Sequence, residues 1–442
     1  MPLPKVGLIT LSLPRERRDL AENFHLAAIN SLKKAGLDVV PHKDISLSTE
    51  ETVSAARELR DNGVDCLIYL IGTWVYPPMI VTATQEVRMP FVLWAMADPQ
   101  SFSLVGGGIV HGSLDEIGIK HKFVYGLPDD QEALKSIVSY ARAAMVVNKL
   151  KGSNFGLIGG RSMGMYTAMV DMAQVKRIFG VEIEHVDQYQ LWLLATQISD
   201  EKAREFYEKI KKEYGRIEPP DEIMMKSIKL YMALKKIVHE KKFDFIGVKC
   251  QPEMIDNYVS CCLGISLLND DGIVTACEAD INAALTMQIM HILADGPVLF
   301  ADVNHIDMEQ RVLRLVNCGA AATTLARDKK DVDWGLQYEY MGKKRGATTV
   351  FCCRKGKVTL ARLSRVGGAY VMQIASGESF EQSKEKFKEA RGKWPHAFIK
   401  LDGDPKEFLQ NIRSNHLHMA YGNFKSELLD FCEILGIKPI LT

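Results

Sequence analysis

Long apolar runs alternate with segments of helical periodicity from the amino end to about residue 301, and this alternation constrains the fold more than any other feature. The runs "VGLITL", "VDCLIYLIG" and "PFVLWAMA" show no polar alternation. Strands that are apolar on both faces belong to parallel sheets that helices cover on both sides. The sequence therefore predicts an α/β fold with parallel, Rossmann-like sheets.

The alternation falls into two blocks, and a β-rich region follows them. The basic stretch "NKLKGSN" at 148–154 is typical of a linker, and a second block starts at "FGLIGG". Beyond about residue 311, "ATTVFCC", "KVTLARL" and "AYVMQIA" favour antiparallel sheet or a small barrel, with a last helix near 424–435. A chain of 442 residues exceeds one core. We predict three domains: 1–150, Rossmann-like; 151–310, α/β and carrying the metal carboxylates; and 311–442, β-rich with a terminal helix.

Charge and cysteine content argue against several classes of protein. Lys+Arg and Asp+Glu balance at 55 each, which gives no electrostatic basis for binding nucleic acid or an anionic membrane. The segment "MPLPKVGLITLS" lacks the pattern of a signal peptide, and no apolar run is long enough to span a bilayer. The nine cysteines include no CxxC pair, so we expect reduced, buried thiols. These features predict a cytoplasmic protein.

Two apolar runs of one predicted strand–helix–strand unit each stop at an acid. Glu278 follows "IVTAC" and Asp302 follows "VLFA". If 273–277 and 298–301 are neighbouring parallel strands, their carboxyl ends meet at the ligand-binding edge of the sheet. Two carboxylates at such a short distance repel each other unless a cation lies between them. Carboxylate oxygens are suitable ligands for Mn²⁺ or Mg²⁺. The alternative is that the two acids only cap the elements that follow.

The segment "RSNHLHMAYGN" offers a third ligand. It contains His416 and His418, between the β-rich region and the last helix. We expect the two imidazoles to point to opposite sides of an extended segment, so that at most one faces the site. A structural role for both histidines is the alternative.

These motifs resemble the L-fucose/L-arabinose isomerase superfamily. The run "KCQPE…CCLGISLLNDDGIVTACEADINAALTM…GPVLFADV" is similar to its central domain, and "SNHLHMAYGN" is similar to the end of its C-terminal domain. L-Fucose isomerases bind Mn²⁺ through a Glu, an Asp and a His preceded by Asn. The resemblance places these ligands at Glu278, Asp302 and His416, with Asn415 before the histidine. The arabinose branch uses two acids and two histidines, so the chain sides with the fucose type.

The resemblance also implies residues that contact the substrate. They are Arg15 in "SLPRER", Trp74 in "GTWVYPP", His111 in "VHGSLDEIGI", Met163 in "GGRSMG", Gln251 in "KCQPE" and Asn415. The alternatives are a core or interface position for Trp74, a core position for Met163 and a structural role in a loop for His111. The "GGRSMG" stretch lacks the GxGxxG spacing of a dinucleotide loop.

The resemblance implies aldose–ketose isomerisation of an open-chain sugar through a cis-enediol(ate). Mn²⁺ (or Mg²⁺ or Co²⁺) would be the cofactor, Glu278 and Asp302 the acid–base groups, and the assembly a homo-oligomer, a trimer or hexamer. In these isomerases the first domain covers the pocket of a neighbouring subunit. Two alternatives are an isomerase or epimerase of a modified (sulfonated or deoxy) sugar with the same metal triad, and a non-catalytic sugar-binding protein.

Overall fold

The computed structural model describes residues 3–337, 346–382, 387 and 394–442, which form two compact units. The first unit comprises Met1–Lys149 and Ser426–Gly436, and the second comprises Leu150–Lys425 and Ile437–Thr442. The break at 149–150 lies at the start of the predicted linker, whereas the last helix belongs to the first unit. The three-domain boundaries stay a prediction. Every described helix is too short or too polar to cross a membrane.

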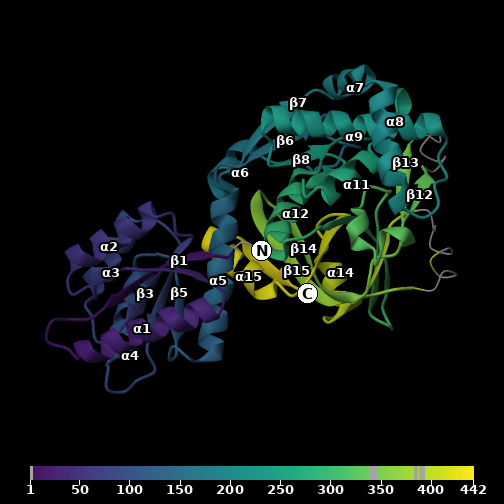
Figure 1. Cartoon of the computed structure of the whole chain (residues 1–442). Helices are drawn as coiled ribbons and strands as arrows, with labels where there is room; N and C mark the ends of the chain where they lie inside the picture. Colours follow the sequence, from purple (N-terminus) through teal and green to yellow (C-terminus); the bar gives the residue numbers. More distant parts are fainter. Residues whose placement is uncertain (1–2, 338–345, 383–386, 388–393) are drawn as a thin grey trace. The chain divides into compact units, whose positions relative to one another are not determined.

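The first unit is built on a five-stranded parallel sheet in the order β2-β1-β3-β4-β5 (Figure 1). Its strands are β1 (Lys5–Leu11), β2 (Asp38–Pro41), β3 (Cys66–Ile71), β4 (Phe91–Ala95) and β5 (Lys122–Tyr125). One face packs on α1 (Arg18–Lys34) and α5 (Gln131–Leu150), and the other on α2 (Thr49–Asp61), α3 (Pro77–Glu86) and α4 (Ser103–Glu116). Both faces are buried, as the apolar runs predict.

Within the first unit, the terminal helix α15 (Lys425–Leu435) is held by partly buried ion pairs. The Arg142 guanidinium lies 2.7 Å from Glu427, and the Lys122 ammonium lies 2.8 Å from Asp430. Gly436 ends the helix at φ +69°, a left-handed conformation that glycine adopts without strain. The predicted helix and its glycine cap are confirmed.

The second unit begins with a four-stranded parallel sheet in the order β7-β6-β8-β9. Its strands are β6 (Asn154–Ile158), β7 (Glu182–Val186), β8 (Phe245–Val248) and β9 (Thr275–Cys277). The helices of this region are α6 (Met172–Phe179), α7 (Gln188–Gln197), α8 (Asp200–Ile210), η1 (Lys211–Glu213), α9 (Asp221–Lys241), α10 (Glu253–Asn257), α11 (Cys262–Asp270) and α12 (Ile281–Ala294).

A closed antiparallel barrel completes the second unit. The order β14-β17-β10-β11-β16-β15 closes through pairing of β14 with β15, and β18 adds to β15 in parallel. The strands are β10 (Leu299–Asp307), β11 (Val312–Val316), β14 (Gly356–Val366), β15 (Ala369–Phe380), β16 (His396–Leu401), β17 (His416–Tyr421) and β18 (Lys438–Leu441). A separate ribbon pairs β12 (Asp333–Leu336) with β13 (Ala347–Val350). The short helices η2 (Thr323–Leu325), η3 (Lys329–Asp331) and α14 (Pro405–Gln410) join these strands. The predicted fold class, parallel α/β sheets followed by a barrel-like β region and a terminal helix, is confirmed.

One expectation about the strands is wrong. β9 and β10 are not neighbours in a parallel sheet, because β10 is a barrel strand that pairs antiparallel with β11 and β17. It also continues past Asp302 to Asp307 instead of stopping at the acid. The helix between them, α12, packs against β14 and β17, so it connects the sheet to the barrel instead of returning to the sheet. The apolar run "VLFA" is equally compatible with a strand of the parallel sheet and with a strand of the barrel.

Candidate metal and active site

Glu278 lies directly after β9 in an unusual backbone turn. Glu278 and Ala279 have φ of +59° and +52°, the left-handed region that non-glycine residues seldom adopt. Such conformations cost roughly 1–3 kcal/mol each and concentrate at functional sites. The turn ends at Asp280, whose carboxylate accepts a hydrogen bond from the backbone N–H of Ala283 and caps α12. Two carboxylates, Glu278 and Asp280, are thereby buried at the carboxyl end of one strand.

Asp302 and His416 lie beside each other on two neighbouring strands of the barrel. They are paired in register on the antiparallel strands β10 and β17. The Asn415 side-chain amide donates to Asp302 Oδ1 at 2.8 Å, so the Asn-His motif holds the carboxylate from the adjoining strand. Burial raises the pKa of Asp302, and the Glu278 carboxylate adds to this, whereas His416 and Asn415 oppose it.

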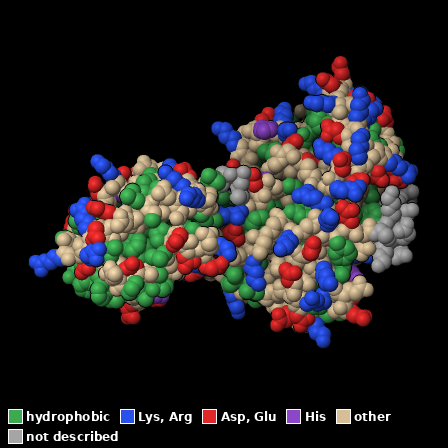
Figure 2. All heavy atoms as spheres, turned by 60° about the horizontal axis from the view of Figure 1, so that its bottom comes forward, with side chains coloured by type: hydrophobic (Ala, Val, Ile, Leu, Met, Phe, Trp, Pro, Cys, Tyr) green, Lys and Arg blue, Asp and Glu red, His purple; other side chains and the backbone are tan. Residues whose placement is uncertain are grey.

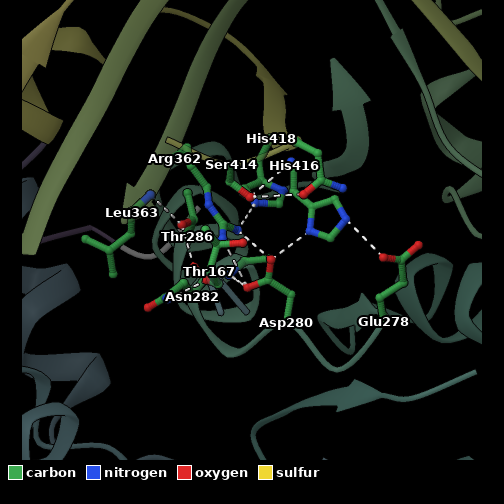
Figure 3. A network of polar contacts seen from close by, with 12 residues as sticks. Thr167, Glu278, Asp280, Asn282, Thr286, Arg362, Leu363, Ser414, His416 and His418 are labelled. Carbon is green, nitrogen blue, oxygen red and sulfur yellow. Dashed lines mark hydrogen bonds and ion pairs between the residues drawn. The ribbon is translucent and has the colours of Figure 1, made fainter. Parts of the chain in front are cut away.

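The imidazole of His416 faces both acids that the sequence singles out, Glu278 (Figure 3) and Asp302. Its Nε2 lies 3.2 Å from Glu278 Oε2 and 3.7 Å from Asp302 Oδ1. Three residues far apart in the chain thus meet where the sheet of the second unit adjoins the barrel. The prediction that Glu278, Asp302 and His416 lie together agrees with this geometry, although the strand pairing from which it was argued is wrong.

A buried ion pair between Asp280 and Arg362 holds the Nδ1 side of the His416 ring. Its Nδ1 lies 2.7 Å from Asp280 Oδ2, and the same oxygen lies 2.9 Å from the Arg362 guanidinium on β14 (Figure 3). Burial raises the pKa of Asp280, but Arg362 and His416 outweigh it and the net pKa is lowered. Burial lowers the pKa of His416, but the bonds to Asp280 and Glu278 prevail and raise it to about 9. Asp280 is thus an ionised carboxylate that fixes one ring nitrogen.

Sequence reasoning missed Asp280 and Arg362. Each left a signal: Asp280 stands at the N-cap position of the predicted helix after "IVTACEA", and Arg362 interrupts the apolar strand "KVTLARL". An arginine that is 1% exposed needs a buried partner, but the sequence does not show which acid supplies it.

The expectation that the two histidines point to opposite sides is also wrong. Residues two apart on a strand lie on the same face, and both rings pack on Phe300 with centroids 4.4 and 5.4 Å away. His418 is fully buried, and its Nε2 lies 3.4 Å from the Arg362 guanidinium. Burial, and then the charge of Arg362, lower its pKa well below the usual value. His418 is therefore a neutral support for Arg362, and His416 alone faces the acids.

The residues around His416 fit a divalent metal ion. A histidine that ligates a metal characteristically bonds a carboxylate or carbonyl through its other ring nitrogen, as His416 does with Asp280. Two carboxylate oxygens and one imidazole nitrogen are donors that suit Mn²⁺ and Mg²⁺. Among the described residues, two other groups have their ligand atoms within 4.8 Å of one another: His111–Asp115–His121 and Cys277–Glu278–Cys318. The donors around His416 are more widely spread.

Comparison with known proteins gives one domain match and several distant relatives. Residues 315–441 match the model of the L-fucose isomerase C-terminal domain. Sulfoquinovose isomerase from Alkalicoccus urumqiensis is 25% identical over 325 residues, 72% of this chain and 73% of that protein. Sulfoquinovose isomerase from Priestia aryabhattai is 24% identical over 374 residues, 82% of each chain. These matches support an L-fucose isomerase-like superfamily, and they support a sugar isomerase, an intramolecular oxidoreductase.

Likeness to solved structures adds nothing to this assignment. A solute-binding protein of an ABC transporter from Burkholderia multivorans is 13% identical and covers 67% of this chain and 95% of its own. Its TM-score of 0.19 is too low to support an argument. The matches to isomerases support an enzyme over the alternative of a non-catalytic sugar-binding protein.

Two further residues implied by the superfamily belong to the second unit, in loops that follow strands of its sheet. Met163 lies after β6, is exposed, and has a left-handed φ of +46°. Its loop is anchored near the site, because the carbonyl of Thr167 accepts bonds from Asn282 and Arg362. Gln251 follows β8 and is half-buried.

The remaining three, Arg15, Trp74 and His111, belong to the first unit. Arg15 is exposed after β1, and Trp74 is half-buried after β3. The glycine-rich "GGGIVHG" is part of helix α4, so His111 lies on a helix and not in a loop. Within α4, His111 Nδ1 lies 2.7 Å from His121 Nε2. Their roles toward a substrate stay predictions.

Proposed function

We propose that the protein is a metal-dependent aldose–ketose isomerase that acts on an open-chain sugar through a cis-enediol(ate). The observation that carries the proposal is the orientation of His416. Its Nδ1 is held by the buried Asp280, and its Nε2 faces Glu278 and Asp302. A histidine that served only the packing of the core would not need two additional carboxylates, since burying Glu278 and partly burying Asp302 cost free energy.

The chemistry divides between the ion and the chain. A divalent ion held by Glu278, Asp302 and His416 would act as a Lewis acid toward the sugar carbonyl and the negative charge that develops beside it. One of the two carboxylates takes the proton from the carbon next to the carbonyl. The other moves a proton between the two sugar oxygens, and one of the two carboxylates then returns a proton to the former carbonyl carbon. Asn415 orients Asp302 for this role through its 2.8 Å hydrogen bond.

The substrate proposed here carries an anionic group, as in a sulfonated sugar. Two considerations support it: the named relatives are sulfoquinovose isomerases, and Arg161 is exposed in the loop after β6, above the Tyr166 ring at 5.1 Å. Among the described residues, no carboxylate lies within ion-pair distance of Arg161. The ends of β6 and β9 are two strand spacings apart, about 10 Å. An open-chain hexose with a terminal anion can span from the acids toward Arg161.

Replacing Arg161 by methionine should therefore weaken binding of an anionic sugar selectively. A hydrogen bond to a charged group contributes about 1.5–3 kcal/mol, so KM for sulfoquinovose should rise roughly 10- to 100-fold while kcat changes less. The matched control is Arg177→Met, which removes an exposed arginine on α6. Steady-state kinetics on sulfoquinovose and on its neutral 6-deoxy counterpart give the test. Equal losses on both sugars would contradict the role of Arg161, and a neutral sugar as the better substrate of the unaltered enzyme would point to the fucose-type activity.

We also propose a cytoplasmic homo-oligomer, a trimer or hexamer, in which the first unit completes the site of a neighbouring subunit. Hydrophobic side chains gather on the face of the first unit seen in Figure 2. Its exposed apolar residues include Tyr76, Phe102, Leu104, Val105 and Ile109. Exposed apolar groups in such number favour contact with another chain.

Subunit mixing tests this sharing directly. His111→Ala and Glu278→Gln chains should each be inactive alone, and activity should return after subunit exchange, because some mixed oligomers then hold one intact site. The measurement is isomerase activity of the mixture, with exchange verified by native mass spectrometry. A monomer in solution, or proven exchange without recovery, would contradict the shared site and leave the proposed metal chemistry unaffected.

A further inference from the structure

Two thiols lie beside Glu278, outside the set of groups that the proposed reaction uses. Cys277 ends β9, Cys318 follows β11, and their Sγ atoms are 4.0 Å apart. One ligand atom from each of Cys277, Glu278 and Cys318 lies within 4.8 Å of the other two. In a tetrahedral zinc site with Zn–S bonds of about 2.3 Å, two sulfur atoms are about 3.8 Å apart. The observed sulfur spacing is therefore already close to that of a shared ion.

The donor types decide which ion would bind. Thiolates select soft or borderline ions such as Zn²⁺ over Mn²⁺ and Mg²⁺, which prefer oxygen. We propose that Cys277, Cys318 and Glu278 form a binding site for a thiophilic divalent ion such as Zn²⁺, and that its occupation inhibits the isomerase. On binding, the two thiol protons pass to solvent, and a water molecule takes the fourth position. No oxidant or reductant is required.

The thiol site is partly accessible to solvent through Cys318, and hydrogen bonds hold the Cys318 loop in place. Of the nine cysteines, seven are buried, whereas Cys318 and Cys352 are half-buried. Cys318 is thus the thiol through which an ion reaches the buried Cys277. Its loop is held in place, because Asn317 Oδ1 accepts bonds from the N–H groups of Gly319 and Ala320, and Gln337 donates to the Cys318 carbonyl. Little rearrangement is then needed to bring the donors together.

Inhibition follows from the position of Glu278. Its Oε2 lies 3.2 Å from His416 Nε2, so the same carboxylate belongs to both groups of donors. An ion held by the two sulfur atoms would draw the carboxylate away from the catalytic ion. The inhibitory effect rests on the proposed function, whereas binding to the thiols does not.

Cobalt gives a readout of binding that is independent of activity. Full-length protein, stripped of metal and reduced with a phosphine, is titrated with Co²⁺. We expect the near-ultraviolet charge-transfer absorption of a Co²⁺–thiolate bond in the wild type and in Cys352→Ser, and its loss in Cys318→Ser. Cys277→Ala is a second variant that should also lose it. Absence of the band from the wild type, or its persistence in Cys318→Ser, would overturn the site.

A second experiment separates this site from simple replacement of the catalytic ion. Zn²⁺ is titrated into the active enzyme in excess Mn²⁺. Cys318→Ser should need at least about tenfold more Zn²⁺ for half-inhibition than the wild type and Cys352→Ser. Equal sensitivity would place the inhibition at the Mn²⁺ site and overturn the inhibitory role. If the enzyme shows no isomerase activity, the proposed function fails while the cobalt result still decides the thiol site.

Discussion

Glu278→Gln and Asp302→Asn should each lower turnover by several orders of magnitude while the protein stays folded. Loss of one positioned acid–base group alone costs about 10²–10⁴-fold in rate. Each substitution also replaces a charged oxygen donor by a neutral amide, so affinity for the ion falls as well. The measurement is kcat at saturating Mn²⁺, together with circular dichroism to verify the fold.

A matched control comes from the hairpin of β10 and β11, which also carries Asp302. Glu309 is exposed at the turn after β10, and Glu309→Gln should leave turnover unchanged. If Glu278→Gln or Asp302→Asn retains turnover near that of the wild type in excess Mn²⁺, the acids are structural and the proposed mechanism is wrong.

The second large effect concerns stability. Asp280→Asn removes the negative charge 2.9 Å from a guanidinium that is 1% exposed. Removing one partner of a buried ion pair typically costs about 3–5 kcal/mol, because the other charge remains buried without compensation. Asp280 also fixes the His416 ring, and loss of such a support lowers metal affinity about 10- to 100-fold. We expect a lowered urea midpoint and weaker Mn²⁺ binding in the same variant.

A double variant separates these two effects. Asp280→Asn combined with Arg362→Met removes both charges, so most of the stability should return while Mn²⁺ binding stays weak. The surface control is Asp221→Asn, which breaks an exposed pair with Arg204 and should change stability by less than about 1 kcal/mol. If Asp280→Asn is as stable as this control, the buried pair does not have the role inferred for it.

The sequence predicted the elements well because their periodicity is local. The helix expected near 424–435 is α15, and the predicted β segments "KVTLARL" and "AYVMQIA" lie in the barrel strands β14 and β15. The sequence did not predict that β10 belongs to the barrel and not to the parallel sheet. A buried barrel strand and a parallel strand have the same apolar pattern.

The candidate site was only partly visible for a related reason. Glu278, Asp302 and His416 were found because the first two follow apolar runs and the third belongs to a recognisable motif. The Asp280–Arg362 pair joins residues 82 positions apart, and no local pattern connects them. Likewise, the left-handed turn at Glu278 and Ala279 contains no glycine that would reveal it.

The central claim is that Glu278, Asp302 and His416 hold one divalent ion per chain. Its most direct test is a crystal structure of the protein soaked in Mn²⁺, with anomalous diffraction data collected to locate the ion. The account predicts one anomalous peak per chain, bonded to one oxygen of each carboxylate and to Nε2 of His416, with Nδ1 still on Asp280. No peak between the two carboxylates, in crystals that take up Mn²⁺ elsewhere, would contradict it.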